Sequence, residues 1–212
     1  LTAFFDLKVA IALMLVPSFA TNVVQGVIGG ALGVILRRLW FLLAIACIAI
    51  WLSSALLAGA DTAILSAVLG LSLCLYGGLS LTRPQVPEPG RKEIWLSPLI
   101  GAINGGLTGI TGSFVVPGVL YLQALGWPRD VFVQAMGVLF TVSTVALAAA
   151  MSGRGLLPAE LGLLSLVGLV PAFLGMYIGL KVRKRLSEDS FRQVFFISVA
   201  VIGLYIIVRS LI

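Results

Sequence analysis

The sequence predicts an all-α polytopic membrane protein, and three observations predict it. Hydrophobic residues make up 60% of the 212 residues and charged residues only 10%, whereas soluble domains average about 25% charged residues. Long apolar runs with almost no internal charge have the length and composition of membrane-spanning helices. The strict alternation in segments of about ten residues that a transmembrane β-barrel requires is not seen. At this length the chain makes one membrane domain and leaves no room for a soluble catalytic module.

Six full transmembrane helices are expected. They cover about residues 7–28, 39–58, 63–81, 131–151, 158–180 and 191–208. Pro17 lies inside the first of them, where a proline frees a carbonyl and kinks the helix axis, and Pro171 lies inside the fifth. Asp61 is expected to cap the third helix, and Ser187 opens the start signal of the sixth.

A further apolar segment, residues 97–126, is too long for one straight crossing. At about 1.5 Å per residue it would overshoot a hydrocarbon core of roughly 30 Å. Thr, Gly and Ser residues gather near its middle, at 108–113. Two half-helices that meet there fit the bilayer better, with Gly109 ending the first and Ser113 capping the second. We therefore predict a re-entrant helical hairpin at 97–126.

The loop charges favour this hairpin. The chain has 14 Lys and Arg residues against 8 Asp and Glu, a formal net charge of +6. If residues 97–126 crossed the membrane, the basic residues would divide evenly between the two faces. If the segment returns, all but Lys8, Arg154 and Arg209 lie on one face, as the positive-inside rule prefers. The charge then serves topology, and no nucleic-acid partner is expected.

Residues 1–82 and 97–212 are interpreted as two repeats, joined by a polar cytoplasmic linker at 83–96. Asp6 and Asp130 precede the first full helix of each repeat, and a short acidic turn precedes each third helix. The hairpin opens the second repeat, so its counterpart is expected before residue 1, which makes 1–82 an incomplete first repeat of three helices. A hairpin followed by three crossings makes the repeats inverted, an arrangement that supports alternating access.

The expected chemistry of the hairpin is anion binding. Free backbone N–H groups of Phe114, Val115 and Val116, at the start of the second half-helix, would hold an anion without any full charge. Hydroxyl groups at the tip and polar side chains on the first and fourth full helices would line the same cavity; helix–helix packing is the alternative for these polar side chains and for the glycines. The candidate binding residues are Asn104, Thr108, Gly109, Thr111, Gly112, Ser113, Phe114, Thr21, Asn22, Gln25, Gln134, Thr141 and Thr144.

The stretch from Leu107 to Pro117, LTGITGSFVVP, resembles the signature of the sulfite exporter TauE/SafE family, a Gly-rich run followed by an apolar segment and Pro. That family has two related halves, each opening with such a motif, and this chain matches the second motif and lacks the first. The family commonly has a Gly triplet where this chain has Gly112-Ser113-Phe114. The resemblance implies passage of small anions, such as sulfite or organosulfur compounds, across the bacterial inner membrane.

We therefore expect a secondary transporter or exporter of a small anion, namely sulfite, a sulfonate or a related organosulfur anion, without a metal or another cofactor. No predicted helix interior holds an ionisable carboxylate, amine or imidazole, so coupling is expected from the membrane potential or from an ion held on backbone carbonyls. An enzyme is not expected, because the chain has no His, and Cys47 and Cys74 lack polar neighbours in sequence. The alternative is a structural membrane subunit without intrinsic transport. The lipid bilayer is an expected partner, and a homo-oligomer is a further option.

Overall fold

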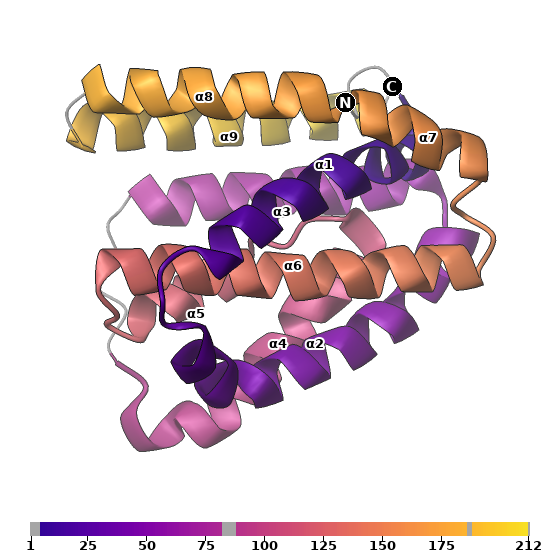
Figure 1. Cartoon of the computed structure of the whole chain (residues 1–212). Helices are drawn as coiled ribbons and strands as arrows, with labels where there is room; N and C mark the ends of the chain where they lie inside the picture. Colours follow the sequence, from indigo (N-terminus) through magenta and orange to yellow (C-terminus); the bar gives the residue numbers. More distant parts are fainter. Residues whose placement is uncertain (1–4, 82–87, 186–187, 212) are drawn as a thin grey trace.

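The computed structural model describes residues 5–81, 88–185 and 188–211, which form a helical bundle (Figure 1). In order these residues form α1 (Leu7–Val27), α2 (Leu32–Gly59), α3 (Thr62–Leu81), the short 3₁₀ helix η1 (Gly90–Lys92), α4 (Glu93–Thr111), α5 (Gly118–Ala124), α6 (Arg129–Gly153), α7 (Ala159–Val167), α8 (Leu169–Arg185) and α9 (Glu188–Leu211). This part of the chain contains no strand. Within it, 6 helical stretches are long and apolar enough to cross a membrane. The predicted all-α membrane fold is confirmed.

Acidic side chains cap two of the helices. Asp61 Oδ1 accepts a hydrogen bond from the Ala63 N–H at 2.9 Å, as the sequence predicts for the start of α3. Asp6 does the same for α1, accepting from the Lys8 N–H at 2.8 Å. Each carboxylate satisfies one backbone donor that a helix start leaves without an intrahelical partner. Ser187, expected in the same role for the last helix, lies outside the described residues.

Two of the predicted helices differ from the structure, one in where it begins and one in its continuity. The second helix begins at Leu32 and not near residue 39, so α2 has 28 residues and is about 42 Å long, more than a hydrocarbon core of roughly 30 Å. The fifth predicted helix is interrupted at Gly168, which separates α7 from α8. Pro171 explains the interruption, because it has no N–H for the carbonyl of Val167 and its ring would clash with that carbonyl.

Three helix pairs make the most extensive contacts: α2 with α4, α3 with α9, and α1 with α6. Reciprocal glycines allow the closest approach of α3 and α9, since a methyl group on Gly70 would lie 2.6 Å from the Gly203 carbonyl oxygen, and one on Gly203 would lie 2.7 Å from the Gly70 carbonyl oxygen. Gly26 and Gly137 bring α1 and α6 together in the same way. These two pairs join corresponding helices of the two repeats expected from the sequence, and the inverted repeat stays a prediction.

Two arginine side chains mark the two ends of the helical bundle. At one, the Arg38 guanidinium donates to both carboxylate oxygens of Glu93 at 2.8 Å and lies 5.1 Å from the centre of the Trp127 ring. At the other, Arg154 Nε donates to Ser54 Oγ at 2.9 Å, and Arg154 Nη2 donates to the Trp51 carbonyl. We call these the Arg38 end and the Arg154 end. Figure 1 shows α8 and α9 on one side of the bundle and α2 and α4 on the other.

Candidate functional site

The segment that the sequence singles out contains a helix break. α4 ends at Thr111 and α5 begins at Gly118, and the six residues between them are not helical. Both flanks of the segment meet at the Arg38 end, because Glu93 and Trp127 both contact Arg38. The Gly118 N–H donates to Asn104 Oδ1 at 3.0 Å, so the chain has turned back along α4 by the time α5 starts. We call residues 112–117 the break.

Two details of the predicted half-helices are wrong. Gly112 ends α4, with a φ of 70°, whereas Gly109 lies inside the helix. Ser113 does not cap α5, because hydrogen bonds hold it to the end of α4. Its N–H donates to Thr111 Oγ1 at 3.2 Å, and its carbonyl accepts from Thr108 Oγ1 at 3.0 Å. The N-cap of α5 is Pro117, four residues later than predicted, and the helix begins at Gly118.

The glycines before the break pack α4 onto α2. A methyl group on Gly101 would lie 2.5 Å from the Leu42 carbonyl oxygen, and one on Gly109 would lie 2.7 Å from the Ile50 carbonyl oxygen. Gly105 meets α2 between them. These contacts support the alternative interpretation of the glycine spacing, close helix packing, and they give Gly109 a role in packing.

The break opens into a cavity of about 230 Å³, which we call the tip pocket. Its polar lining comes from Thr111, Gly112 and Ser113, and the other walls are apolar. They are Leu7, Ala10, Ile11 and Met14 of α1 and Leu69 of α3. No charged side chain lines the tip pocket among the described residues. Of the candidate binding residues, the structure brings together here Thr111 at the end of α4 and the first two residues of the break.

The next three residues of the break carry backbone N–H groups without a partner. Within the described residues, the N–H groups of Phe114, Val115 and Val116 donate no hydrogen bond. In an apolar interior an unpaired amide costs several kcal/mol, so the break needs water or a ligand as acceptor. The Phe114 ring itself packs against Phe140, with the ring centres 5.9 Å apart, so its side chain contributes to packing.

The buried glutamines of α1 and α6 hold helices together. Gln134 is fully buried, donates from Nε2 to the Gly26 carbonyl at 2.9 Å and accepts the Ala31 N–H at 2.9 Å. Gln25 Nε2 donates to the Val133 carbonyl at 3.0 Å. Neither lines the tip pocket, and at about 1.5 Å per residue Gln25 lies roughly 21 Å along α1 from Ile11. Their positions support the packing interpretation.

The remaining candidates on these helices bond mostly to their own helix. Thr21 Oγ1 donates to the Pro17 carbonyl at 2.9 Å, and Thr141 Oγ1 donates to the Gly137 carbonyl at 2.7 Å. Thr144 Oγ1 likewise donates to the Phe140 carbonyl at 2.7 Å. Asn22 is half-buried, and its side-chain amide has no hydrogen-bond partner among the described residues. None of the four lines the tip pocket.

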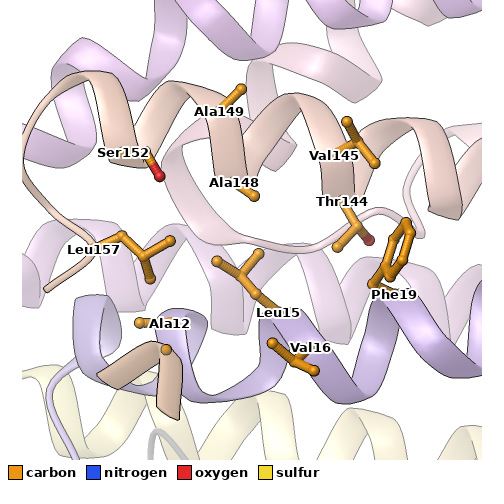
Figure 2. Close-up of a pocket in the computed structure, with 11 residues that line it drawn as sticks. Ala12, Leu15, Val16, Phe19, Thr144, Val145, Ala148, Ala149, Ser152 and Leu157 are labelled. Atoms are coloured by element: carbon orange, nitrogen blue, oxygen red, sulfur yellow. The ribbon is translucent and has the colours of Figure 1, made fainter. Parts of the chain in front are cut away.

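A second cavity, of about 400 Å³, lies between α1, α6 and α7. Figure 2 shows side chains of α1, among them Leu15 and Phe19, facing Thr144 and Ala148 of α6. Almost all of its lining is apolar, and the Thr144 hydroxyl already donates within its helix. This cavity suits apolar contents and offers little to an anion.

Sequence reasoning missed Ser165, whose hydroxyl bonds to the backbone of α1 just before Pro17. Ser165 is 1% exposed, and its Oγ donates to the Leu13 carbonyl at 2.8 Å and accepts the Val16 N–H at 3.1 Å. Pro17 has no N–H for the Leu13 carbonyl, and Ser165 takes that place. Gly168, at the gap between α7 and α8, lies against the Pro17 ring. The sequence signal was Pro17 alone, which predicts a free carbonyl and does not name its partner.

A comparison with family models matches residues 1–206 to the model described as Sulfite exporter TauE/SafE. The chain belongs to this family. Membership of the TauE/SafE family agrees with the six helical stretches that are long and apolar enough to cross a membrane. The chain is therefore a multi-pass membrane protein of a sulfite and anion exporter family. Comparisons of this TauE/SafE chain with curated proteins and with solved structures found no match.

Proposed function

We propose that the chain is a secondary transporter that exports a small anion, sulfite or a related sulfonate, across the bacterial inner membrane, and that the anion binds at the break. The observation that carries this proposal is the set of unpaired N–H groups of Phe114, Val115 and Val116. Backbone of this kind is tolerated at membrane depth only where it lines a cavity or is buried in protein. The tip pocket lies at the same break. The Ser113 hydroxyl is available there to an oxyanion, whereas Thr111 Oγ1 donates to the Leu107 carbonyl at 2.6 Å.

Neutral donors suit transport better than a fixed cation would. Amide and hydroxyl groups give charge-assisted hydrogen bonds to an anion, yet they leave no buried opposite charge that would hold it permanently. The tip pocket has apolar walls on α1 and α3, so the few donors of the break act where water competes weakly. Conduction needs binding that is favourable enough to admit the anion and weak enough to release it.

The proposal includes the topology of the segment. Both flanks lie at the Arg38 end, which by the positive-inside rule is the cytoplasmic face. Residues 93–127 then enter from the cytoplasm and return to it, and the tip pocket lies toward the outer face. Single cysteines replacing Arg91 and Arg129, in a background without Cys47 and Cys74, should label from the cytoplasmic side only. A cysteine replacing Ser152 should label from the other side; labelling of the first two from opposite faces would show that the segment crosses.

Sulfite efflux from proteoliposomes tests the function. The double variant Thr111→Val with Ser113→Leu removes two hydroxyls and fills the tip pocket, and its flux should fall to the level of empty liposomes. The matched control, Ala149→Leu, adds bulk to the lining of the apolar cavity and should keep wild-type flux. Equal sulfite flux in both variants would show that the anion does not bind at the break. Absence of flux for sulfite, thiosulfate, sulfate and organosulfonates in the wild type would favour a structural subunit.

A further inference from the structure

We infer that Asn104 and Ser143 form a second, inner binding position for the transported oxyanion, buried between α4, the break and α6. The inference rests on the proposed function, because it names a further position for the same anion. Two buried polar side chains from different helices carry it, and each has an atom without a hydrogen-bond partner.

Asn104 presents an unused donor. Its side chain is 0% exposed, and Oδ1 accepts the Gly118 N–H at 3.0 Å. That bond fixes the orientation of the amide, because only the oxygen can accept a hydrogen bond from an N–H. Nδ2 therefore points away from Gly118, and it is buried without an acceptor.

Ser143 presents the second unused group. It is 1% exposed, and its Oγ has no partner. A helical serine can donate to the carbonyl one turn earlier, as the threonines at 141 and 144 of the same helix do. Ser143 does not, and its hydroxyl remains available.

The two groups belong to the same region of the bundle. Gly118 lies against both Asn104 and Leu139, since a methyl group on it would be 2.7 Å from Asn104 Oδ1 and 2.8 Å from Leu139 Cδ2. Ser143 follows Leu139 by four positions, so it lies on the same face of α6, one turn toward the Arg154 end. The neighbouring Phe140 packs against Phe114 of the break. α6 thus presents Ser143 on the side that contacts the break.

Three other buried hydroxyls of the described residues, those of Ser80, Ser97 and Tyr121, also lack a hydrogen-bond partner. A buried donor left unpaired costs about 1–3 kcal/mol, and this cost is recovered when a ligand supplies the acceptor.

The chemistry of the two groups selects an oxyanion. The Asn104 amide nitrogen can only donate, and the Ser143 hydroxyl can donate as well. A cation would find no ligand in the amide nitrogen, whereas one oxygen or two neighbouring oxygens of sulfite can accept from both. Neither residue lines the tip pocket, and Asn104 lies seven residues before Thr111, about 10 Å nearer the Arg38 end. An anion from the cytoplasmic face would therefore meet the inner position before the tip pocket.

Substitution of Ser143 by Ala tests the inference with little disturbance of the fold. It removes a hydroxyl that bonds to nothing in the empty protein, so the unfolding temperature without sulfite should not fall. The KM for sulfite efflux should rise about tenfold or more, because a hydrogen bond to a charged group is lost. The matched control is Ser72→Ala on α3, whose Oγ donates to the Val68 carbonyl at 2.8 Å within its helix; its KM should not change.

Asn104→Asp supplies the second readout. It keeps an oxygen for the Gly118 N–H and exchanges the free donor for an acceptor, so the rise in unfolding temperature that sulfite produces should be smaller than in the wild type. Wild-type KM in both variants would overturn the inference and leave the proposed function intact. A fall in the stability of Ser143→Ala at unchanged KM would indicate a structural water and would also overturn it. Should Asn104→Asp not fold, Ser143→Ala alone decides. A wild type with neither sulfite flux nor sulfite stabilisation would overturn both proposals.

Discussion

Two adjacent glycines of α4 allow a sharp test of the packing between α2 and α4. A methyl group on Gly105 would meet the Ala46 carbonyl oxygen and lie 2.9 Å from Ala49 Cβ. A methyl group on Gly106 would meet nothing within 4 Å. Gly105→Ala should therefore destabilise the protein, and Gly106→Ala should leave it equally stable or stabilise it.

The magnitude follows from comparing the two variants with each other. Each replaces a helical glycine by alanine and gains about 0.5–1 kcal/mol of helix propensity, which cancels in the comparison. What remains is the cost of overpacking at Gly105, about 1–3 kcal/mol. For a chain of this size about 1 kcal/mol corresponds to roughly 2–4 °C, so the two unfolding temperatures should differ by about 2–12 °C.

Thermal unfolding of the purified variants in one detergent, followed by helical circular dichroism, measures this difference. Wild-type protein and both variants are unfolded at the same concentration and heating rate. If Gly105→Ala unfolds at the same temperature as Gly106→Ala, or at a higher one, α2 and α4 do not approach as closely as the contacts of Gly105 require.

Three further outcomes are expected. Arg38→Ala should cost about 1 kcal/mol of stability, whereas Arg37→Ala should stay within about 0.5 kcal/mol; equal effects in thermal unfolding would contradict the contact that joins the flanks of the segment. Ser165→Ala should cost about 1–3 kcal/mol of stability. The same change in a Pro17→Ala background should cost less, because that background restores a backbone N–H at position 17 for the Leu13 carbonyl; a double-mutant cycle in chemical unfolding measures the coupling. Anion efflux should rise when the liposome interior is made negative, since each charge gains about 2.3 kcal/mol per 100 mV; flux that ignores a valinomycin-set potential would indicate electroneutral coupling.

Much of the fold follows from local properties of the sequence. Apolar runs of about 20 residues form membrane helices because the backbone must satisfy its own hydrogen bonds in lipid, and five of the six expected helices are unbroken. The break in the 97–126 segment was also readable, since the segment exceeds the bilayer thickness and holds residues that end helices. Asp61 capped its helix as expected, because a cap involves side chain and backbone only two residues apart.

The candidate site was predicted less well, and the reason is physical. A polar residue in a membrane helix must find a hydrogen-bond partner, and the sequence does not say which one. Gln134 finds its partners at the turn from α1 to α2, more than a hundred residues away, whereas Asn104 keeps a donor free. From the sequence, both are polar residues in apolar segments.

The sequence by itself determined which stretches have the length and composition to enter the membrane, that one of them breaks, and the family of exporters to which the chain belongs. The tertiary structure decided which glycine ends α4, because Gly109 packs on α2 and Gly112 is left to turn the chain. It also decided which polar groups remain unpaired. Insertion depends on composition summed along a segment, while packing and pairing depend on the atom that another helix brings opposite.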